Sequence, residues 1–200
     1  WNMARNQQAT PTTANFMMMQ GLNADGSRDP SLPIYLDVDN LIDYQMIIGY
    51  TGNYDAPLSD FVGASNNWYT VRDRERDSFG FQFFVHDGEH SMGAGGKWNG
   101  ANDRINTSNG SGSRGAYNKS NPSFLHFDLA DGTEEYRLRF ADRAHLALFN
   151  GGQLTRDQVF GLMDSRRSTV ADVIIAESAR WGDSKRTDPL DEQDWINAVN

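Results

Sequence analysis

The sequence predicts an α+β fold that is mainly helical, with one short β-hairpin and a long insertion rich in Gly, Ser and Asn. Apolar residues recur at helical spacing in the last third of the chain, and Phe residues alternate with small or polar partners near residue 81. A chain of 200 residues with 38% apolar and 12% aromatic side chains can bury one core, so we expect one domain.

The first predicted helix covers residues 38–50. Residues 1–36 are mixed in character and include a polar turn at residues 23–27. Asp37 is a typical helix N-cap residue. The apolar residues that follow it lie on more than one side of the helix, which predicts that this helix is buried. These residues are Leu41, Ile42, Met46, Ile47 and Ile48.

The hairpin is predicted from two short segments, residues 68–72 and 79–85, after a loop at residues 51–67. Phe79, Phe81 and Phe83 follow the period of two that is typical of a strand. Consecutive strands joined by a short charged turn, here residues 73–78, usually pair with each other. Residues 93–122 are then dominated by Gly, Asn and Ser, and we interpret them as a flexible insertion.

Two helices are predicted after the insertion. Tyr136, Phe140, Ala144 and Leu148 recur every four residues, and the sequence Asn-Gly-Gly at 150–152 ends that helix. Thr155 and Gln158 have the spacing of a capping box for the next helix. Its predicted apolar face consists of Val159, Leu162, Met163, Val170, Val173 and Ile174, and Trp181 and Trp195 are expected to anchor a polar tail.

Composition excludes several classes of function. The formal charge of -9 argues against a nucleic-acid partner, because binding phosphates requires a basic face. The sequence contains no apolar run of about 18 residues, so we expect no membrane span. The chain has no cysteine, which excludes disulfides and thiolate chemistry but leaves the compartment open.

Three oxygen-bearing side chains form the main candidate site. Asp55, Asn67 (or its neighbour Asn66) and Asp87 all lie in loops or at strand ends, where a rigid scaffold can hold functional groups. Phosphoryl transfer needs a carboxylate to orient the acceptor hydroxyl, together with a carboxylate and an amide oxygen to hold Mg²⁺. Protein kinases use the same order of Asp, Asn and Asp. Because Asp and Asn are also common in turns and caps, this pattern alone leaves a purely structural interpretation open.

Several segments resemble one family, the CotH kinases, which are atypical kinases first known as spore coat protein H. The matching segments are LDVDNLIDY (36–44), GNYD (52–55), NNWY (66–69), FFVHDGEHS (83–91), YRLRFADR (136–143), FNGG (149–152) and AESARWGD (176–183). They occur in order along most of the chain outside the insertion.

The resemblance implies a kinase-like C-terminal lobe over residues 1–200. Asp55 would be the catalytic aspartate, Asp87 a metal ligand, and Asn67 or Asn66 the second metal ligand. It further implies ATP as co-substrate, Mg²⁺ or Mn²⁺ as the metal, a protein substrate with a Ser or Thr acceptor, and a secreted or cell-surface bacterial protein. The nucleotide-clamping N-terminal lobe is expected to lie outside this sequence. Kinase activity is therefore expected of the parent protein, and the prediction does not extend to this chain alone.

Other interpretations come from different classes. A non-catalytic surface or binding module could keep the same fold, because fold does not dictate function. The segment from His86 to His90 matches the H-x-x-E-H pattern of inverted zinc peptidases, but Gly88 opposes the helix that this chemistry needs. The oxygen spacing from Asn23 to Asp29 is that of a short calcium loop, or of a plain polar turn. Methionines 17–19 are expected to pack in the core.

Overall fold

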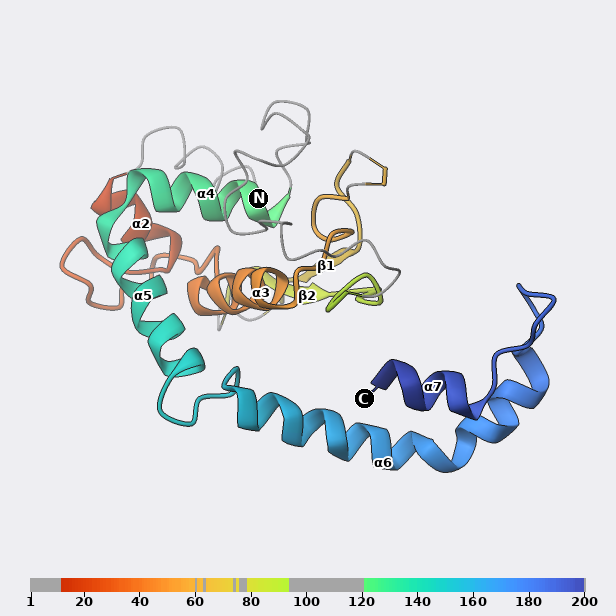
Figure 1. The fold of residues 1–200 in the computed structure, drawn as a ribbon. Coiled ribbons are helices and arrows are strands. Elements are labelled where there is room, and N and C mark those ends of the chain that lie inside the picture. The colour runs from red at the N-terminus through yellow and green to blue at the C-terminus, as the bar shows by residue number, and fades with distance from the viewer. Residues whose placement is uncertain are drawn as a thin grey trace. The chain divides into compact units, whose positions relative to one another are not determined.

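The computed structural model describes residues 12–59, 61–62, 64–73, 75, 79–93 and 121–199. It is a mixed α+β structure, mostly helical, as predicted (Figure 1). Its elements are α2 (Thr13–Met19), α3 (Val38–Thr51), β1 (Trp68–Val71), β2 (Gln82–Val85), α4 (Pro122–Gly132), α5 (Glu134–Leu148), α6 (Arg156–Trp181) and α7 (Glu192–Val199). The chain forms two compact units, Trp1–His145 and Leu146–Asn200, and each is described by itself.

Helix α3 begins where the sequence predicts and ends one residue later, at Thr51. The carboxylate of Asp37 accepts a hydrogen bond from the backbone N–H of Asn40 at 3.0 Å, which is the N-cap interaction. Gly52 ends the helix in the left-handed conformation, with φ of 61°, a conformation that glycine adopts without steric cost. The buried residues of α3 are Val38, Leu41, Ile42, Tyr44, Gln45 and Ile48.

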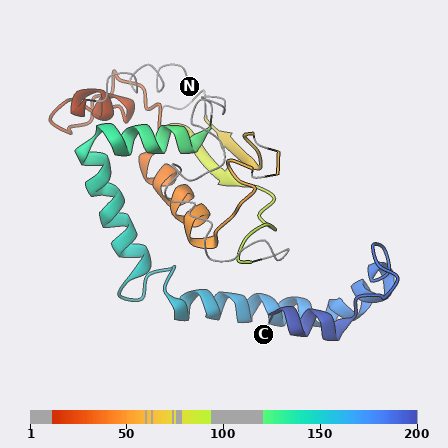
Figure 2. The ribbon, with the colours of Figure 1, turned by 45° about the horizontal axis from the view of Figure 1, so that its top comes forward.

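Strands β1 and β2 form the predicted antiparallel hairpin, with Trp68 opposite Val85 and Val71 opposite Gln82. Strand β2 begins three residues later than the expected start at residue 79. The cause is a close crossing with the segment before α3, where Phe81 forms an isolated bridge to Leu36. Figure 2 shows β2 and α4 each next to α3.

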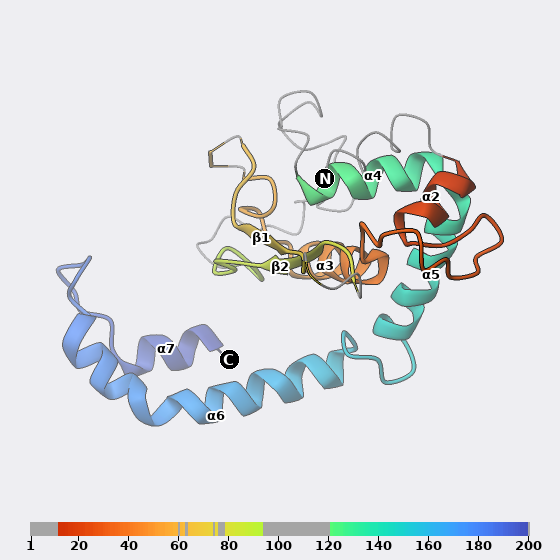
Figure 3. The same cartoon turned by 180° about the vertical axis from the view of Figure 1, so that it is seen from behind.

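Helix α2 lies beside the first turn of α5 (Figure 3). The Thr13 hydroxyl donates to Glu135 at 2.7 Å, and the rings of Phe16 and Tyr136 meet edge to face at 6.1 Å. Of methionines 17–19, Met19 is buried and the first packs against the core, while the middle one is 38% exposed. The prediction that these methionines pack in the core is therefore confirmed for two of the three.

Ion pairs join α5 to α3. Arg143 contacts Asp43 at 2.5 Å and Asp39 at 3.2 Å, and Arg139 contacts Asp39 at 2.6 Å. Both helices present their charges four residues apart, so two successive turns of each helix meet. The hydrogen bond from the Arg139 guanidinium lowers the pKa of Asp39.

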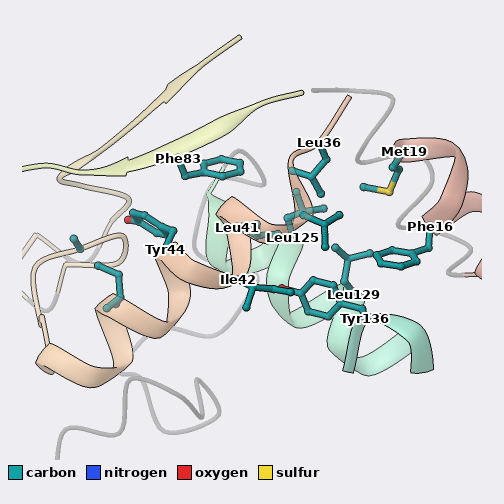
Figure 4. Close-up of a cluster of buried hydrophobic side chains, with 13 residues drawn as sticks. Phe16, Met19, Leu36, Leu41, Ile42, Tyr44, Phe83, Leu125, Leu129 and Tyr136 are labelled. Carbon is teal, nitrogen blue, oxygen red and sulfur yellow. The ribbon is translucent and has the colours of Figure 1, made fainter. Parts of the chain in front are cut away.

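The core of the first unit lies between β2, α3, α4 and the beginning of α5, as Figure 4 shows. Its buried members are Phe16, Met19, Leu36, Val38, Leu41, Ile42, Tyr44, Ile48, Ala56, Phe83, Leu125, Leu129 and Tyr136. A buried polar pair completes it, in which His126 Nδ1 and the Tyr136 hydroxyl lie 2.6 Å apart.

The predicted insertion ends earlier than expected, because Asn121 and Pro122 belong to the start of α4. Asn121 is its N-cap and accepts a hydrogen bond from Ser123 at 2.8 Å, and Pro122 occupies the first turn, where its missing N–H costs nothing. Residues 121–122 therefore belong to the folded unit, since Asn121 is completely buried. The rest of the predicted insertion, residues 94–120, lies outside the described residues.

The second unit departs from two predictions. Thr155 precedes α6 as its N-cap residue, but no capping hydrogen bond forms, and its hydroxyl donates to the Gly152 carbonyl at 2.6 Å instead. No residue of α6 is buried, because α7 is the only described element of this unit that packs against it. Trp181 is 52% exposed and lies against the Arg180 guanidinium, so it does not anchor the tail.

None of the described helices combines the length and the apolar character that crossing a bilayer requires. This finding agrees with the expectation of no membrane span.

Candidate functional site

The site is built on the loop that follows α3. After the left-handed turn at Gly52, the backbone N–H of Asn53 donates to the Ile48 carbonyl at 3.2 Å, which folds the chain back on the helix end. The Asn53 side chain then accepts a hydrogen bond from the backbone of Asp55 at 2.9 Å. These bonds hold Asp55 in a buried position, with 7% of its surface exposed.

Three neutral donors surround the carboxylate of Asp55. Its Oδ2 accepts hydrogen bonds from Asn67 Nδ2 at 2.7 Å and from Asn66 Nδ2 at 3.2 Å, and its Oδ1 accepts one from the Ser59 hydroxyl. The structure thus brings together the aspartate and both asparagines that the sequence analysis selected. No Lys, Arg or His among the described residues forms an ion pair with Asp55.

The long interval between Asp55 and Asn67 closes on itself. Leu58 and Ser65 form an isolated antiparallel bridge, and the backbone N–H of Asn66 donates to the Pro57 carbonyl at 3.1 Å. The side chain of Asn121, at the start of α4, also donates to the Pro57 carbonyl at 2.7 Å and to Ser65 at 3.1 Å. The residues between Asp55 and Asn67 therefore do not separate these two side chains.

A second loop, at the end of β2, lies against the first. The backbone N–H of Tyr54 donates to the His90 carbonyl at 3.2 Å, and that of Met92 donates to the Thr51 carbonyl at 2.7 Å. The Tyr54 hydroxyl lies 2.9 Å from His90 Nδ1. The His90 ring also packs against Tyr54 and Phe61, with centroid distances of 5.0 and 4.7 Å.

This second loop delivers Glu89 and His90 to Asp55. One ligand atom from each of these three residues lies within 4.8 Å of the others. Glu89 Oε1 is 3.3 Å from His90 Nε2. Asp87 lies in the same loop, is exposed, has a positive φ of 50°, and is not one of the three.

Sequence reasoning considered Glu89 and His90 only as part of the H-x-x-E-H pattern. Residues 86–90 form no helix in the structure, in agreement with the effect expected of Gly88. His86 packs on the Tyr69 ring at 4.6 Å, outside the group formed by Asp55, Glu89 and His90. The only sequence signal that Asp55 lies near residues 89–90 is that both segments are predicted as loops next to secondary structure.

Residues 23–29, the alternative calcium loop, form no group of metal-ligand atoms like that of Asp55, Glu89 and His90 among the described residues. Asp25 accepts hydrogen bonds from the backbone and hydroxyl of Ser27, and Asp29 accepts the same pair from Ser31. These bonds lower the pKa of both carboxyls. They are the interactions by which Asp stabilises a tight turn.

The donor set as a whole suits a divalent cation and a hydroxyl group. It offers carboxylate oxygens, amide oxygens and one imidazole, all at the meeting point of two loops held by backbone hydrogen bonds.

Comparison of the sequence with protein-family models and with curated proteins, and of the structure with solved structures, gives no match. The resemblance to the CotH kinases therefore stays a prediction from the segments quoted above.

Proposed function

We propose that this chain carries the catalytic part of an enzyme that transfers the terminal phosphoryl group of ATP to a Ser or Thr hydroxyl of a protein, with Mg²⁺ or Mn²⁺ bound. The main support is the buried carboxylate of Asp55, which is held by the side chains of Asn66, Asn67 and Ser59. Kinase-type catalysis consists mainly of positioning and electrostatic stabilisation, and a carboxylate fixed in this way supplies the first of these.

Asp55 has the acceptor capacity that this role needs. A carboxylate offers about four lone-pair positions, and three of those of Asp55 are occupied by Ser59, Asn66 and Asn67. The remaining position would accept the proton of a substrate hydroxyl. The hydroxyl oxygen then forms a bond to the terminal phosphorus, the bond from that phosphorus to the bridging oxygen breaks, and ADP leaves while Asp55 holds the proton.

Asn67 and Asp87 would hold the metal, with Asn66 as the alternative amide. Because Nδ2 of each asparagine donates to Asp55, its Oδ1 stays available as an oxygen ligand of the kind that Mg²⁺ prefers. The bound metal supplies neutralisation of the phosphate charge. Asn53 Nδ2, a buried donor without a hydrogen-bond partner among the described residues, adds a group that a ligand oxygen could satisfy.

The test measures transfer from γ-labelled ATP to Ser or Thr, with Mg²⁺ and with Mn²⁺, using the longest natural form of the protein. We expect Asp55→Asn to lower the rate by at least about 100-fold, because the amide cannot take the proton. Asp87→Ala should likewise abolish transfer. Asp172→Asn, an exposed carboxylate on α6, is the matched control and should leave the rate unchanged. Full activity of Asp55→Asn contradicts the assignment of the base.

A second function, a non-catalytic binding module, is favoured by one observation. Helix α6 exposes several large apolar side chains within its unit, including Phe160, Val173 and Ile175, which are each more than half exposed. Exposed apolar surface is typical of interaction sites. Absence of ATP binding and of transfer with either metal would favour this function over the enzyme.

A further inference from the structure

Asp55, Glu89 and His90 lie close enough together to bind one metal ion after small side-chain movements. Neighbouring ligands of a tetrahedral ion with bonds of about 2.0–2.2 Å lie roughly 3.3–3.6 Å apart. Glu89 Oε1 and His90 Nε2 are separated by 3.3 Å, and all three ligand atoms lie within 4.8 Å of one another. Small rotations of these side chains would bring the three atoms around one ion.

His90 also has the partner that a metal-binding imidazole requires. A histidine that binds a metal through Nε2 carries its proton on Nδ1, and a neighbouring acceptor normally fixes this tautomer. The Tyr54 hydroxyl lies 2.9 Å from Nδ1 and can accept that proton in a hydrogen bond. The rings of Tyr54 and Phe61 hold the imidazole plane, and the Tyr54 backbone is bonded to the His90 carbonyl.

Asp55 provides an independent observation. A buried carboxylate is normally paired with a cation or bound to a metal, because burying an uncompensated charge is costly. Asp55 is 7% exposed and has only neutral donors as hydrogen-bond partners among the described residues. Its one remaining acceptor position faces no described cationic partner, so a bound cation would complete the site.

The ligand types select the ion. Mg²⁺ and Ca²⁺ prefer oxygen ligands throughout, whereas first-row transition metals bind imidazole nitrogen readily. We propose that Asp55, Glu89 and His90 form a site for a first-row transition-metal dication, with Zn²⁺ bound most tightly among Mn²⁺, Co²⁺ and Zn²⁺. Three protein ligands leave at least one coordination position for water or another ligand.

The site would also regulate the proposed transfer reaction. Asp55 has a single free acceptor position, so an ion held by Asp55, Glu89 and His90 excludes the acceptor hydroxyl from the same carboxylate. Zn²⁺ is therefore expected to inhibit transfer. This consequence depends on the proposed function, whereas binding of the metal does not.

The test measures binding directly, with the chain of 200 residues freed of metal by a chelator. Co²⁺ is titrated by its visible absorption, and Zn²⁺ is then titrated by displacement of Co²⁺. We expect one ion per chain, and an affinity lowered by about 100-fold or more in Glu89→Gln and in His90→Gln, since loss of outer-shell partners alone costs 10–100-fold. Glu89 is exposed, so its substitution should leave the fold intact, which circular dichroism checks.

Two further variants make the result specific. His86→Gln removes a histidine from the same loop that lies outside the site, and it should bind Co²⁺ as the wild type does. Tyr54→Phe removes the hydroxyl that lies against Nδ1 and should weaken binding by about 10-fold. Unchanged binding in Glu89→Gln, or an equal loss in His86→Gln, overturns the proposed site. Binding without any transfer activity keeps the metal site and removes the proposed function.

Discussion

Asn40 shows how one side chain can connect two elements. Its Oδ1 accepts a hydrogen bond from the Phe83 backbone N–H, and its Nδ2 donates to the Phe83 carbonyl at 3.2 Å. An amide can satisfy both backbone groups of one residue because it carries a donor and an acceptor side by side. Asn40 thereby joins α3 to β2, the strand that leads into the loop of Glu89 and His90.

Replacing Asn40 should reveal this double interaction. We expect Asn40→Ala to lower the free energy of unfolding by about 2–3 kcal/mol, because both backbone groups of Phe83 lose their hydrogen bonds to Asn40. Asn40→Asp keeps the acceptor but places an oxygen against the Phe83 carbonyl, so it should also be less stable than the wild type. Urea denaturation of the two variants and the wild type measures the difference. Equal stability of Asn40→Ala and the wild type would show that water replaces the amide at no cost.

At the scale of elements, the position of the hairpin depends on how closely β2 approaches the segment before α3. The Phe81 backbone N–H donates to the Tyr35 carbonyl at 2.9 Å, and that of Asp37 donates to the Phe81 carbonyl at 3.2 Å. Gly80 makes this approach feasible, because a Cβ atom there would lie 2.2 Å from the backbone nitrogen of Leu36. A close approach of two backbones is a common reason for glycine at such a position.

Gly80→Ala should therefore disrupt the docking of the hairpin. We expect a loss of about 3 kcal/mol or more, at the upper end of the cost of overpacking, since the clash involves backbone atoms that cannot rotate away. Gly88→Ala is the matched control, because its Cβ would meet only a Val85 methyl group at 3.5 Å. Thermal unfolding of both variants measures the contrast. Similar melting temperatures for the two would contradict the close crossing.

At the scale of the whole molecule, stability is expected to depend on the buried polar pair in the core of the first unit. Burial lowers the pKa of His126 to about 4, and it raises the pKa of Tyr136 well above its usual range. Both groups are therefore neutral in the folded state at pH 7, and they share a hydrogen bond of 2.6 Å. Charging the imidazole is easier in the unfolded chain, where its pKa is about 6.5.

The sign of the pH effect follows from this difference. Above pH 6.5 neither state binds the proton and the full stability is present. As the pH falls from 6.5 towards 4, the unfolded state gains the proton first and stability is lost, by about 2 kcal/mol at pH 5.

His126→Asn cannot titrate and keeps an amide near the position of Nδ1. Between pH 7.5 and pH 5 its free energy of unfolding should therefore fall by about 2 kcal/mol less than that of the wild type. Chemical denaturation at the two pH values compares the two proteins. Equal pH dependence of both would show that His126 is not the responsible group.

The sequence by itself determined the features that depend on near neighbours. The cap at Asp37 set the start of α3, the alternation of Phe residues marked the second strand, and residues 150–152 ended α5. It also selected Asp55 together with Asn66 and Asn67. These predictions succeeded because a cap, a turn or a strand period is decided by interactions within a few residues along the chain.

Only the tertiary structure decided which distant side chains meet. Glu89 and His90 reach Asp55 because the backbones of Tyr54 and His90, 36 residues apart, are joined by a hydrogen bond, and no local pattern encodes that pairing. For the same reason the sequence predicted the apolar face of α6 but not whether it is buried, and among the described elements of its unit only α7 packs against it. Periodicity fixes which side of an element is apolar, whereas burial depends on a partner that the fold must supply.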